Sequence, residues 1–366
     1  MIPRATNSCA IEKRLVIEEL DKIDRLRDEM KRCGVELFII QDVRKLGFFT
    51  ELFNMSGRLY LHITGETRFY PVETQWEQAI SAKETSLVIP EKPCSADLLE
   101  FELRNEANGV SKIACDQISL KFYKKFIEIL NFEPIQGEDI IARVIRHYSE
   151  AELKLVRKAA EVADAGFEAA RETIRQGIRE LEVLAQMQQT FRRKGSEWDP
   201  WIVFGSGSNS AFPEATPIDR VIEGGDMIFI DIGPLYRGYP SDITRTYIVG
   251  TPNPSQRRIL NSLLEVEEKA IEMSKEGANL GRLDARVRRL VTEKGFNDYR
   301  HHTGHALNYS FDITPSCYAD LELGDVICLE PGIYMPGIGG GRMEDEIIIT
   351  GDGPEIITHD DRDPYL

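Results

Sequence analysis

Residues 225–250, GDMIFIDIGPLYRGYPSDITRTYIVG, decide the fold of the C-terminal half of the chain. The apolar residues Met227 to Ile230 lead into Asp231, and a second acid, Asp242, follows a segment rich in glycine and proline. An apolar run of this length predicts a buried strand, and the turn residues after it predict a hairpin that returns Asp242 beside Asp231. Burying an ionised carboxylate costs several kcal/mol unless a positive group compensates it. The two acids therefore indicate a cation.

The pattern recurs closer to the C-terminus. Glu330 follows the apolar residues 326–329, and Glu344 follows a glycine-rich turn and precedes the apolar run that ends at Thr350. His305 lies in a glycine-containing segment that holds three of the six histidines of the chain. No comparable group of Arg and Lys is interleaved with these acids, so a shared metal is the simplest compensating charge. Four carboxylates and one imidazole would balance two divalent ions, and this ligand set suits Mn, Co, Fe or Zn alike.

Composition restricts the class of protein. The chain has 366 residues, 42% of them hydrophobic, which is long enough and apolar enough for two cores. Because no stretch approaches the roughly 20 apolar residues of a membrane span and no signal-peptide pattern is present, a cytoplasmic protein without a membrane partner is expected. A formal charge of −16 without a Lys/Arg block argues against nucleic acid as a partner and favours small molecules. The six cysteines form no CxxC pair and are expected to be free thiols.

The element pattern predicts two domains, 1–146 and 147–366. In the first, helices and strands alternate, which indicates an α/β domain with a mixed sheet in which His62 is structural. Its strands are expected at 35–41, 58–64, 67–73, 86–90 and 112–116, and its helices at 17–33, 98–104 and 121–130. In the second, long amphipathic helices are expected from 149 onward and at 178–194, 255–275 and 283–294. They separate strands at 201–206, 226–233, 244–250, 325–334 and 344–350, which indicates an α+β layer with helices on one face of a curved antiparallel sheet.

Four segments carry a family resemblance: residues 225–250, HHTGH at 301–305, GDVICLEPGIY at 324–334 and GGRMEDEIIIT at 340–350. They resemble the successive motifs of the prolidase, aminopeptidase P, methionine aminopeptidase and creatinase superfamily, which has the pita-bread fold. The helix entry SEAELKLVRKAAEVADAG at 149–166 resembles the start of its catalytic domain. The resemblance implies a C-terminal pita-bread domain after a smaller creatinase-type α/β domain, a homodimer, and two divalent metal ions bound by Asp231, Asp242, His305, Glu330 and Glu344.

The resemblance also implies a mechanism and further site residues. In the peptidases of this superfamily, a hydroxide that bridges two metals attacks an amide carbonyl. The residue that matches Glu330 also shuttles a proton from the water to the leaving amine. Arg342 resembles an arginine that orients the cluster and sometimes the substrate, and His301 matches an active-site histidine of some aminopeptidase P relatives.

Two positions depart from the family pattern. Residues 213–217 read PEATP, so Glu214 stands where the family has a substrate-binding histidine, and Asp312 stands where a second one is usual. A carboxylate donates no hydrogen bond to an oxyanion unless it is protonated. Three functions therefore stay open: an Xaa-Pro peptidase of the prolidase or aminopeptidase P type, a hydrolase or lyase like creatinase or ectoine hydrolase acting on a cationic small molecule, and a non-catalytic binding protein. In the second, Glu214 and Asp312 face the positive charge of the substrate.

Overall fold

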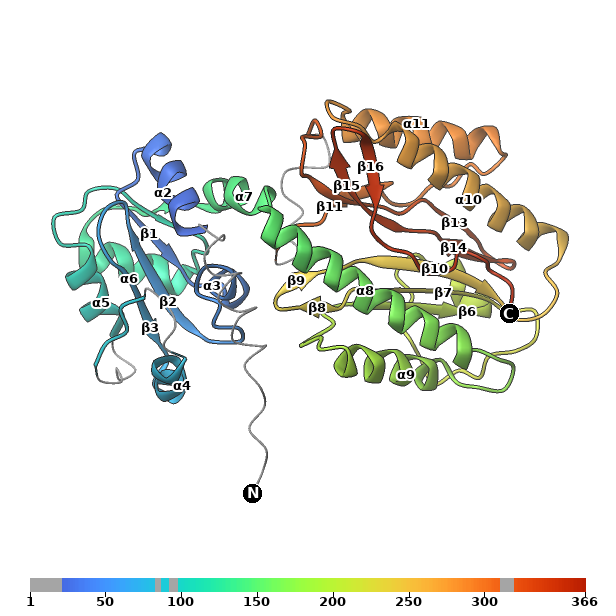
Figure 1. Cartoon of the computed structure of the whole chain (residues 1–366), viewed down its shortest axis with the longest axis horizontal. Coiled ribbons are helices and arrows are strands. Elements are labelled where there is room, and N and C mark those ends of the chain that lie inside the picture. The colour runs from blue at the N-terminus through green and yellow to red at the C-terminus, as the bar shows by residue number, and fades with distance from the viewer. Residues whose placement is uncertain (1–21, 83–86, 92–97, 310–318) are drawn as a thin grey trace, which may run out of the picture. The chain divides into compact units, whose positions relative to one another are not determined.

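The structure is a computed structural model that describes residues 22–82, 87–91, 98–309 and 319–366. The chain divides into two compact units, Met1–Ala151 and Glu152–Leu366, and most of their elements are labelled in Figure 1. The domain limits at 146 and 147 stay a prediction. Within the described ranges no helix is long and apolar enough to cross a membrane.

The N-terminal unit contains a five-stranded sheet with the order β3-β2-β1-β4-β5. β1 pairs antiparallel with β2 and parallel with β4, so the sheet is mixed, as predicted. The strands are β1 (Leu37–Ile40), β2 (Gly57–His62), β3 (Thr67–Pro71), β4 (Ile113–Cys115) and β5 (Ile135–Gln136). The helices are α2 (Lys22–Cys33), α3 (Val43–Thr50), α4 (Trp76–Ser81), α5 (Leu98–Glu106), α6 (Leu120–Leu130) and α7 (Glu138–Arg146).

Two acids on α5 bind this helix to the sheet. Glu102 accepts hydrogen bonds from Arg58 and from Tyr60, each with a contact at 2.8 Å. Glu106, one helical turn later, contacts Nε2 of His62 at 3.0 Å. His62 is therefore a structural residue, which confirms the prediction for it.

The N-terminal unit also differs from the sequence pattern. A strand was expected at 86–90. In residues 87–90, which the structure describes, only an isolated bridge between Val88 and Arg68 is present. Helix α3 was not predicted, although Asp42 caps it by accepting from the backbone N–H groups of Arg44 and Lys45. Asp42 was the feature of the sequence that could have indicated α3, because an aspartate directly before a helix accepts hydrogen bonds from its first free N–H groups.

The C-terminal unit consists of long helices and antiparallel sheets. Its helices are α8 (Glu150–Thr173), α9 (Glu180–Arg193), α10 (Pro254–Met273) and α11 (Leu280–Glu293). Its strands are β6 (Ile202–Ser206), β7 (Met227–Ile232), β8 (Leu235–Tyr236), β9 (Tyr239–Pro240), β10 (Ile243–Ile248), β11 (Gly304–Ala306), β12 (Val326–Leu329), β13 (Gly332–Met335), β14 (Gly339–Arg342), β15 (Asp345–Thr350) and β16 (Gly353–Ile356).

The pairings between these strands are antiparallel, as predicted, but the strands form several sheets instead of one. The main sheets have the orders β10-β7-β6 and β11-β12-β15-β16. The strand expected at 325–334 is interrupted at Glu330 and Pro331, which separate β12 from β13. Proline has no N–H group to donate to a sheet, so the interruption has a local cause.

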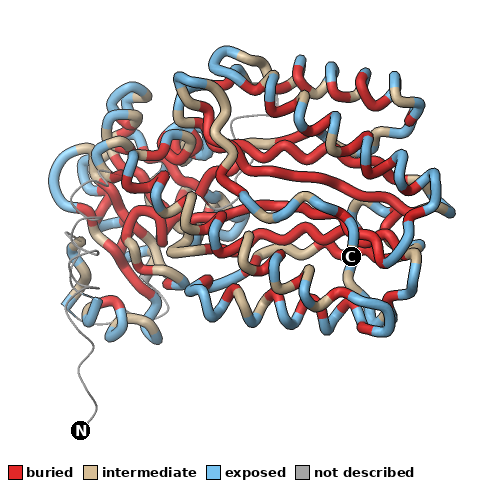
Figure 2. The backbone as a smooth tube through the Cα atoms, turned by 45° about the vertical axis from the view of Figure 1, so that its right-hand side comes forward, coloured by how far each residue is buried: buried red, intermediate tan, exposed pale blue. Residues whose placement is uncertain are grey.

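One order of elements occurs twice in this unit: two helices followed by three strands that belong to one sheet, to which β16 is added as a fourth strand in the second copy. α8, α9, β6, β7 and β10 make the first copy, and α10, α11, β11, β12 and β15 make the second. The apolar residues of α8 and α9 cluster with those of β6, β7 and β10. Those of α10 and α11 cluster with residues of β12, β13 and β15, and with Met227 and Ile248 at the outer ends of β7 and β10. The tube in Figure 2 shows strands that are buried along most of their length beside helices with one exposed face.

This repeat explains where the acids lie. Asp231 near the end of β7 corresponds in place to Glu330, directly after β12. Asp242 directly before β10 corresponds to Glu344, directly before β15. Each copy therefore supplies two acids, and His305 on β11 is supplied by the second copy alone.

Candidate metal centre

The predicted hairpin between Asp231 and Asp242 is present. β7 and β10 pair antiparallel with Asp231 opposite Thr244 and Ile232 opposite Ile243, so Asp242 follows directly in register. Glu344 joins them because its backbone forms a bridge with Thr244. His305 and Glu330 meet through the second sheet, since β11 pairs with β12. The structure thus brings together the five residues that the sequence indicated as metal ligands.

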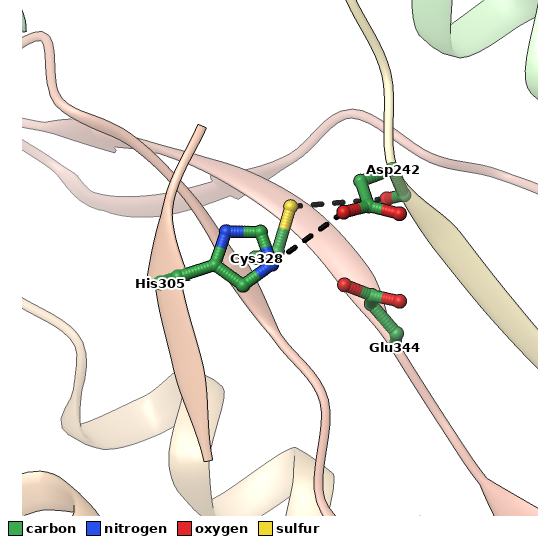
Figure 3. Close-up of side chains that lie close together, drawn as sticks. All are labelled: Asp242, His305, Cys328 and Glu344. Atoms are coloured by element: carbon green, nitrogen blue, oxygen red, sulfur yellow. Dashed lines mark hydrogen bonds and ion pairs between the residues drawn. The ribbon is translucent and has the colours of Figure 1, made fainter. Parts of the chain in front are cut away.

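The side chains form two groups that share Glu344. In the first, ligand atoms of Asp242, His305, Cys328 and Glu344 lie within 4.8 Å of one another (Figure 3). In the second, oxygen atoms of Asp231, Glu330 and Glu344 lie within 4.8 Å of one another. Each group is compact enough for a single ion to contact all of its members.

Two carboxylate oxygens of the first group lack a partner. Oδ1 of Asp242 and Oε1 of Glu344 are buried and have no hydrogen-bond partner among the described residues. Burial, with repulsion from Asp231, raises the pKa of Asp242 to about 7, and burial and the neighbouring acids raise the pKa of Glu344 as well. Buried acids without partners are costly, so the donor set fits a bound cation.

His305 presents one ring nitrogen to the acids. Its Nδ1 contacts the backbone oxygen of Ala306 at 3.1 Å. Its Nε2 lies 3.4 Å from Asp242 and 3.9 Å from Glu330. Burial lowers its pKa, but the bond to Asp242 and the charge of Glu330 outweigh this effect and raise the pKa to about 9. An imidazole fixed through Nδ1 in this way is oriented to offer Nε2 to a metal.

Arg342 is buried beside the second group. Its guanidinium donates to Oδ2 of Asp231 and, at 3.2 Å, to Oγ1 of Thr244. The distance from Nε to Oε2 of Glu330 is 3.6 Å. Arg342 therefore fixes acids of the cluster, and in the absence of a metal Arg342 and His305 provide two positive charges for four carboxylates.

His301 lies next to the cluster. Its Nδ1 is 3.8 Å from Oε2 of Glu330, and its Nε2 is 3.0 Å from the hydroxyl of Tyr334. Burial and the charge of Arg342 lower the pKa of His301 to about 4, so the ring is neutral at pH 7. A catalytic role for His301 stays a prediction.

A pocket of about 240 Å³ opens beside these residues. It is lined by Trp201, Val203, Glu214, Asp231, Asp242, His305, Ala306, Leu307, Glu330 and Arg342. Glu214, one of the two positions that depart from the family pattern, is thus part of the pocket wall. Asp312, the other one, lies outside the described residues.

Three residues around the cluster were not indicated by the sequence pattern. Trp201 donates through Nε1 to Oδ1 of Asp231 at 3.1 Å, and Thr244 donates to Oε2 of Glu344 at 2.7 Å. Cys328 joins the first ligand group. Alternation along strands could have found two of them, since Thr244 lies two residues after Asp242 and Cys328 two residues before Glu330.

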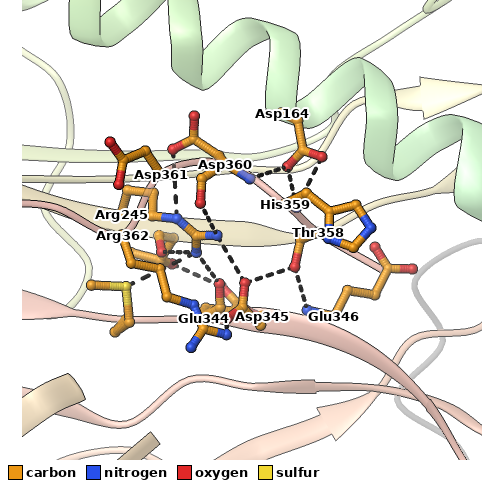
Figure 4. A network of polar contacts seen from close by, with 12 residues as sticks. Asp164, Arg245, Glu344, Asp345, Glu346, Thr358, His359, Asp360, Asp361 and Arg362 are labelled. Atoms are coloured by element: carbon orange, nitrogen blue, oxygen red, sulfur yellow. Dashed lines mark hydrogen bonds and ion pairs between the residues drawn. The ribbon is translucent and has the colours of Figure 1, made fainter. Parts of the chain in front are cut away.

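A second network of charges lies next to the cluster, around Arg245 (Figure 4). Arg245 is almost fully buried and donates to the backbone oxygen of Glu344 at 2.6 Å and to Oδ1 of Asp345 at 2.8 Å. Its Nε lies 3.6 Å from Asp360. Because Arg245 binds the backbone of Glu344, it supports the position of that acid.

Replacing Arg245 with Met should destabilise the protein by about 3–5 kcal/mol, because it leaves buried acids without their cation. Because Arg362 also forms an ion pair with Asp345, the expected loss of stability lies toward the lower limit of this range. Chemical denaturation followed by circular dichroism measures the change. Arg286→Met, at an exposed ion pair with Glu293, is the control and should cost less than about 1 kcal/mol. Equal losses in the two variants would contradict a stabilising role for the network.

Three comparisons with known proteins agree with this geometry. A model of metallopeptidase family M24 matches residues 154–351. The chain is 34% identical over 352 residues to an Xaa-Pro dipeptidase of Pyrococcus horikoshii. This match covers 94% of this chain and 98% of that protein. The solved structure of an Xaa-Pro dipeptidase from Bacillus anthracis has a TM-score of 0.86 and 30% identity and covers 95% of this chain and 100% of the other.

The solved prolidase from Pyrococcus horikoshii OT3 has a TM-score of 0.85 and 29% identity and covers 94% of this chain and 99% of the other. These matches confirm the predicted α+β fold, a pita-bread domain preceded by a smaller N-terminal domain. The chain therefore belongs to metallopeptidase family M24, within the prolidase, aminopeptidase P and creatinase superfamily that its motifs indicated.

Proposed function

We propose that this protein is a metal-dependent Xaa-Pro peptidase of the prolidase type. Asp231, Asp242, His305, Glu330 and Glu344 would hold two divalent ions of Mn, Co, Fe or Zn, with Glu344 shared between them. The observation that carries the proposal is the pair of buried ligand groups that meet at Glu344 beside a pocket. The similarity to Xaa-Pro dipeptidases over nearly the whole chain supports the choice of substrate.

The ions would supply Lewis acidity, which polarises an amide carbonyl and lowers the pKa of water. Glu330 lines the pocket, is largely buried and lies within 4 Å of both His305 and Arg342. In this proposal the carboxylate of Glu330 would take a proton from an attacking water and deliver it to the leaving amine. Arg342 holds Asp231 in position through a hydrogen bond. A neutral His301, whose Nδ1 lies 3.8 Å from Glu330, would limit the movement of the Glu330 side chain.

The pocket volume of about 240 Å³ suits a dipeptide or another small molecule. Glu214 is exposed and forms part of its wall. The free amino group of an Xaa-Pro dipeptide is cationic, so the Glu214 carboxylate would attract it. A homodimer in the cytoplasm is part of the same proposal.

Glu214 also favours a second candidate function, the hydrolysis of a cationic small molecule other than a dipeptide. Purified protein loaded with Mn, Co, Fe or Zn should be assayed in parallel against Xaa-Pro dipeptides, Xaa-Ala dipeptides and cationic amides that lack a peptide bond. We expect the Xaa-Pro dipeptides to be hydrolysed fastest. If only the cationic amides are hydrolysed, the protein is a hydrolase of cationic small molecules and not an Xaa-Pro peptidase. Metal-loaded protein that hydrolyses none of the three substrate classes would contradict both functions.

Glu214→Gln should raise KM for an Xaa-Pro dipeptide about fivefold with little change in kcat, because a water-exposed charge pair at about 4 Å contributes about 1 kcal/mol. Steady-state kinetics of the metal-loaded variant measure the two constants separately. Glu223→Gln, which is exposed and not part of the described pocket wall, is the matched control and should leave both constants unchanged. An unchanged KM in the Glu214 variant would mean that the carboxylate does not face the substrate.

Chelation should lower Tm, and the Tm of the metal-free protein should fall as pH rises from 5 to 9. Folding raises the pKa of Asp242 to about 7 and that of His305 to about 9, so both groups hold their protons more tightly in the folded state. Their contribution is present at low pH and is lost as pH rises through those values. Differential scanning fluorimetry with and without EDTA measures the effect. A metal-free protein that is more stable at pH 9 than at pH 5 would contradict it.

A further inference from the structure

Glu180, the first residue of α9, is a fully buried acid outside the proposed metal centre. One carboxylate oxygen, Oε1, accepts hydrogen bonds from the backbone N–H of Ser206 at 3.0 Å and from the hydroxyl of the same residue. The other oxygen, Oε2, accepts from the backbone N–H of Ile218 at 2.8 Å. Hydrogen bonds to an ionised acceptor are stronger than those between neutral groups, and an acid is favourable in the first turn of a helix. These contacts explain why a carboxylate is stable in this buried place.

Ser206 and Ile218 are the two ends of one loop. Ser206 is the last residue of β6, and residues 207–217, here called the Glu214 loop, lie between the two ends. Glu214 itself is exposed and lines the pocket, so its place in the pocket depends on the backbone that carries it. The carboxylate of Glu180 binds both ends of this backbone at once.

We infer that Glu180 is a positioning residue, which holds the Glu214 loop so that the carboxylate of Glu214 faces the amino group of the substrate. This inference rests on the proposed role of Glu214 in binding a dipeptide. Glu180 is not among the described residues that line the pocket, so it acts on the substrate through Glu214. Loss of its contacts should therefore weaken substrate binding and leave the chemical step unchanged.

Glu180→Gln tests whether two carboxylate oxygens are needed. Glutamine has the same size, but its amide has one oxygen and one NH2 group, which accepts no hydrogen bond. One end of the loop would keep its acceptor, while the N–H group at the other end would face a second donor. Two contacts within the loop remain in the variant, which should therefore fold. The N–H of Phe204 donates to the oxygen of Ala215 at 2.9 Å, and the N–H of Gly340 donates to Oγ of Ser210 at 3.1 Å.

Steady-state kinetics of the metal-loaded protein with an Xaa-Pro dipeptide give the first test. Glu180→Gln should raise KM about threefold at unchanged kcat, because a displaced loop weakens the charge pair at Glu214 without removing it. In a protein that already carries Glu214→Gln, the same change should raise KM no further, since two residues that act through one contact are not additive. An equal rise of KM in both backgrounds, or a loss confined to kcat, would overturn the inference.

Glu182→Gln is the matched control for these kinetics. Glu182 lies on the same helix, is exposed, and accepts a hydrogen bond from the backbone N–H of Arg179 at 3.0 Å. Its replacement should leave KM and kcat at their wild-type values, because neither residue belongs to the Glu214 loop. The same rise of KM in Glu182→Gln as in Glu180→Gln would overturn the inference.

Hydrogen exchange followed by mass spectrometry tests the contacts of Glu180 without turnover. Peptides from the Glu214 loop should exchange at least about threefold faster in Glu180→Gln than in the wild type, whereas peptides from α11 should not change. Unchanged exchange in the loop would overturn the inference. Metal-loaded wild type that hydrolyses no Xaa-Pro dipeptide would overturn the proposed function, while the exchange rates still decide whether Glu180 holds the loop. If Glu180→Gln does not fold, Ser206→Ala, which removes the hydroxyl donor alone, replaces it in both experiments with smaller changes in the same directions.

Discussion

Glu330→Gln should lower kcat for an Xaa-Pro dipeptide by about 10²–10⁴-fold, which is the usual contribution of a positioned acid or base. Gln keeps the size of the side chain and one oxygen atom that can contact a metal, but it cannot take up and release a proton. Glu330 lines the pocket and is 3.6 Å from Nε of Arg342. Gln at this position would therefore leave the surroundings of the site in place while removing the proton transfer.

The measurement is the single-turnover rate of Glu330→Gln with its metal content determined on the same sample. Glu276→Gln, at an exposed position, is the control and should keep the wild-type rate. If the Glu330 variant carries two metals and turns over at a rate close to wild type, Glu330 has no role in proton transfer.

His305→Ala should weaken metal binding by at least about 100-fold and abolish turnover at ordinary metal concentrations. Loss of a group that merely orients a ligand already costs about 10–100-fold in affinity, and His305 is the one nitrogen donor in the two described ligand groups. The cavity left by the ring lies next to the pocket, so added imidazole should restore part of the binding.

Calorimetric titration of the metal-free variant with Zn²⁺ or Mn²⁺ measures this effect. His302→Ala is the matched control, because His302 is a neighbouring histidine that is exposed. Wild-type affinity in His305→Ala, or an equal loss in His302→Ala, would show that His305 does not bind the metal.

The sequence indicated the cluster because its acids follow a rule that needs no tertiary information. Asp231, Glu330 and Glu344 each lie at or near the end of an apolar strand, where a carboxylate is buried against its own preference, and Asp242 follows a turn-rich segment that returns it beside Asp231. Motif order then indicated which acids belong together. The pairing of Asp231 with Thr244 confirms the predicted hairpin, and the long helices α8 to α11 lie close to the predicted ranges.

Contacts between distant segments were not predictable in the same way. Trp201 reaches Asp231 because β6 pairs with β7, and Cys328 reaches His305 because β11 pairs with β12. These registers depend on sheet pairing across long stretches of chain. The repeated order of two helices and three strands was not predicted either. The two copies begin about 100 residues apart, at α8 and α10, and they share the order of their elements more than their residues.

The departures at Glu214 and Asp312 left three functions open on sequence alone. Membership of the M24 family and the similarity to Xaa-Pro dipeptidases argue against a non-catalytic binding protein. Glu214 lines the pocket, and its proposed partner there is the amino group of a dipeptide. The replacement of a histidine by Glu214 therefore predicts an altered mode of substrate binding beside the proposed metal site.

We propose that five side chains hold two divalent ions where the sheets β10-β7-β6 and β11-β12-β15-β16 meet. Anomalous X-ray diffraction from crystals grown with Mn²⁺ or Zn²⁺ tests it most directly. Two anomalous peaks are expected, one among Asp242, His305 and Glu344 and the other among Asp231, Glu330 and Glu344. A single peak, or peaks outside this cluster in crystals that contain the metal, would contradict it.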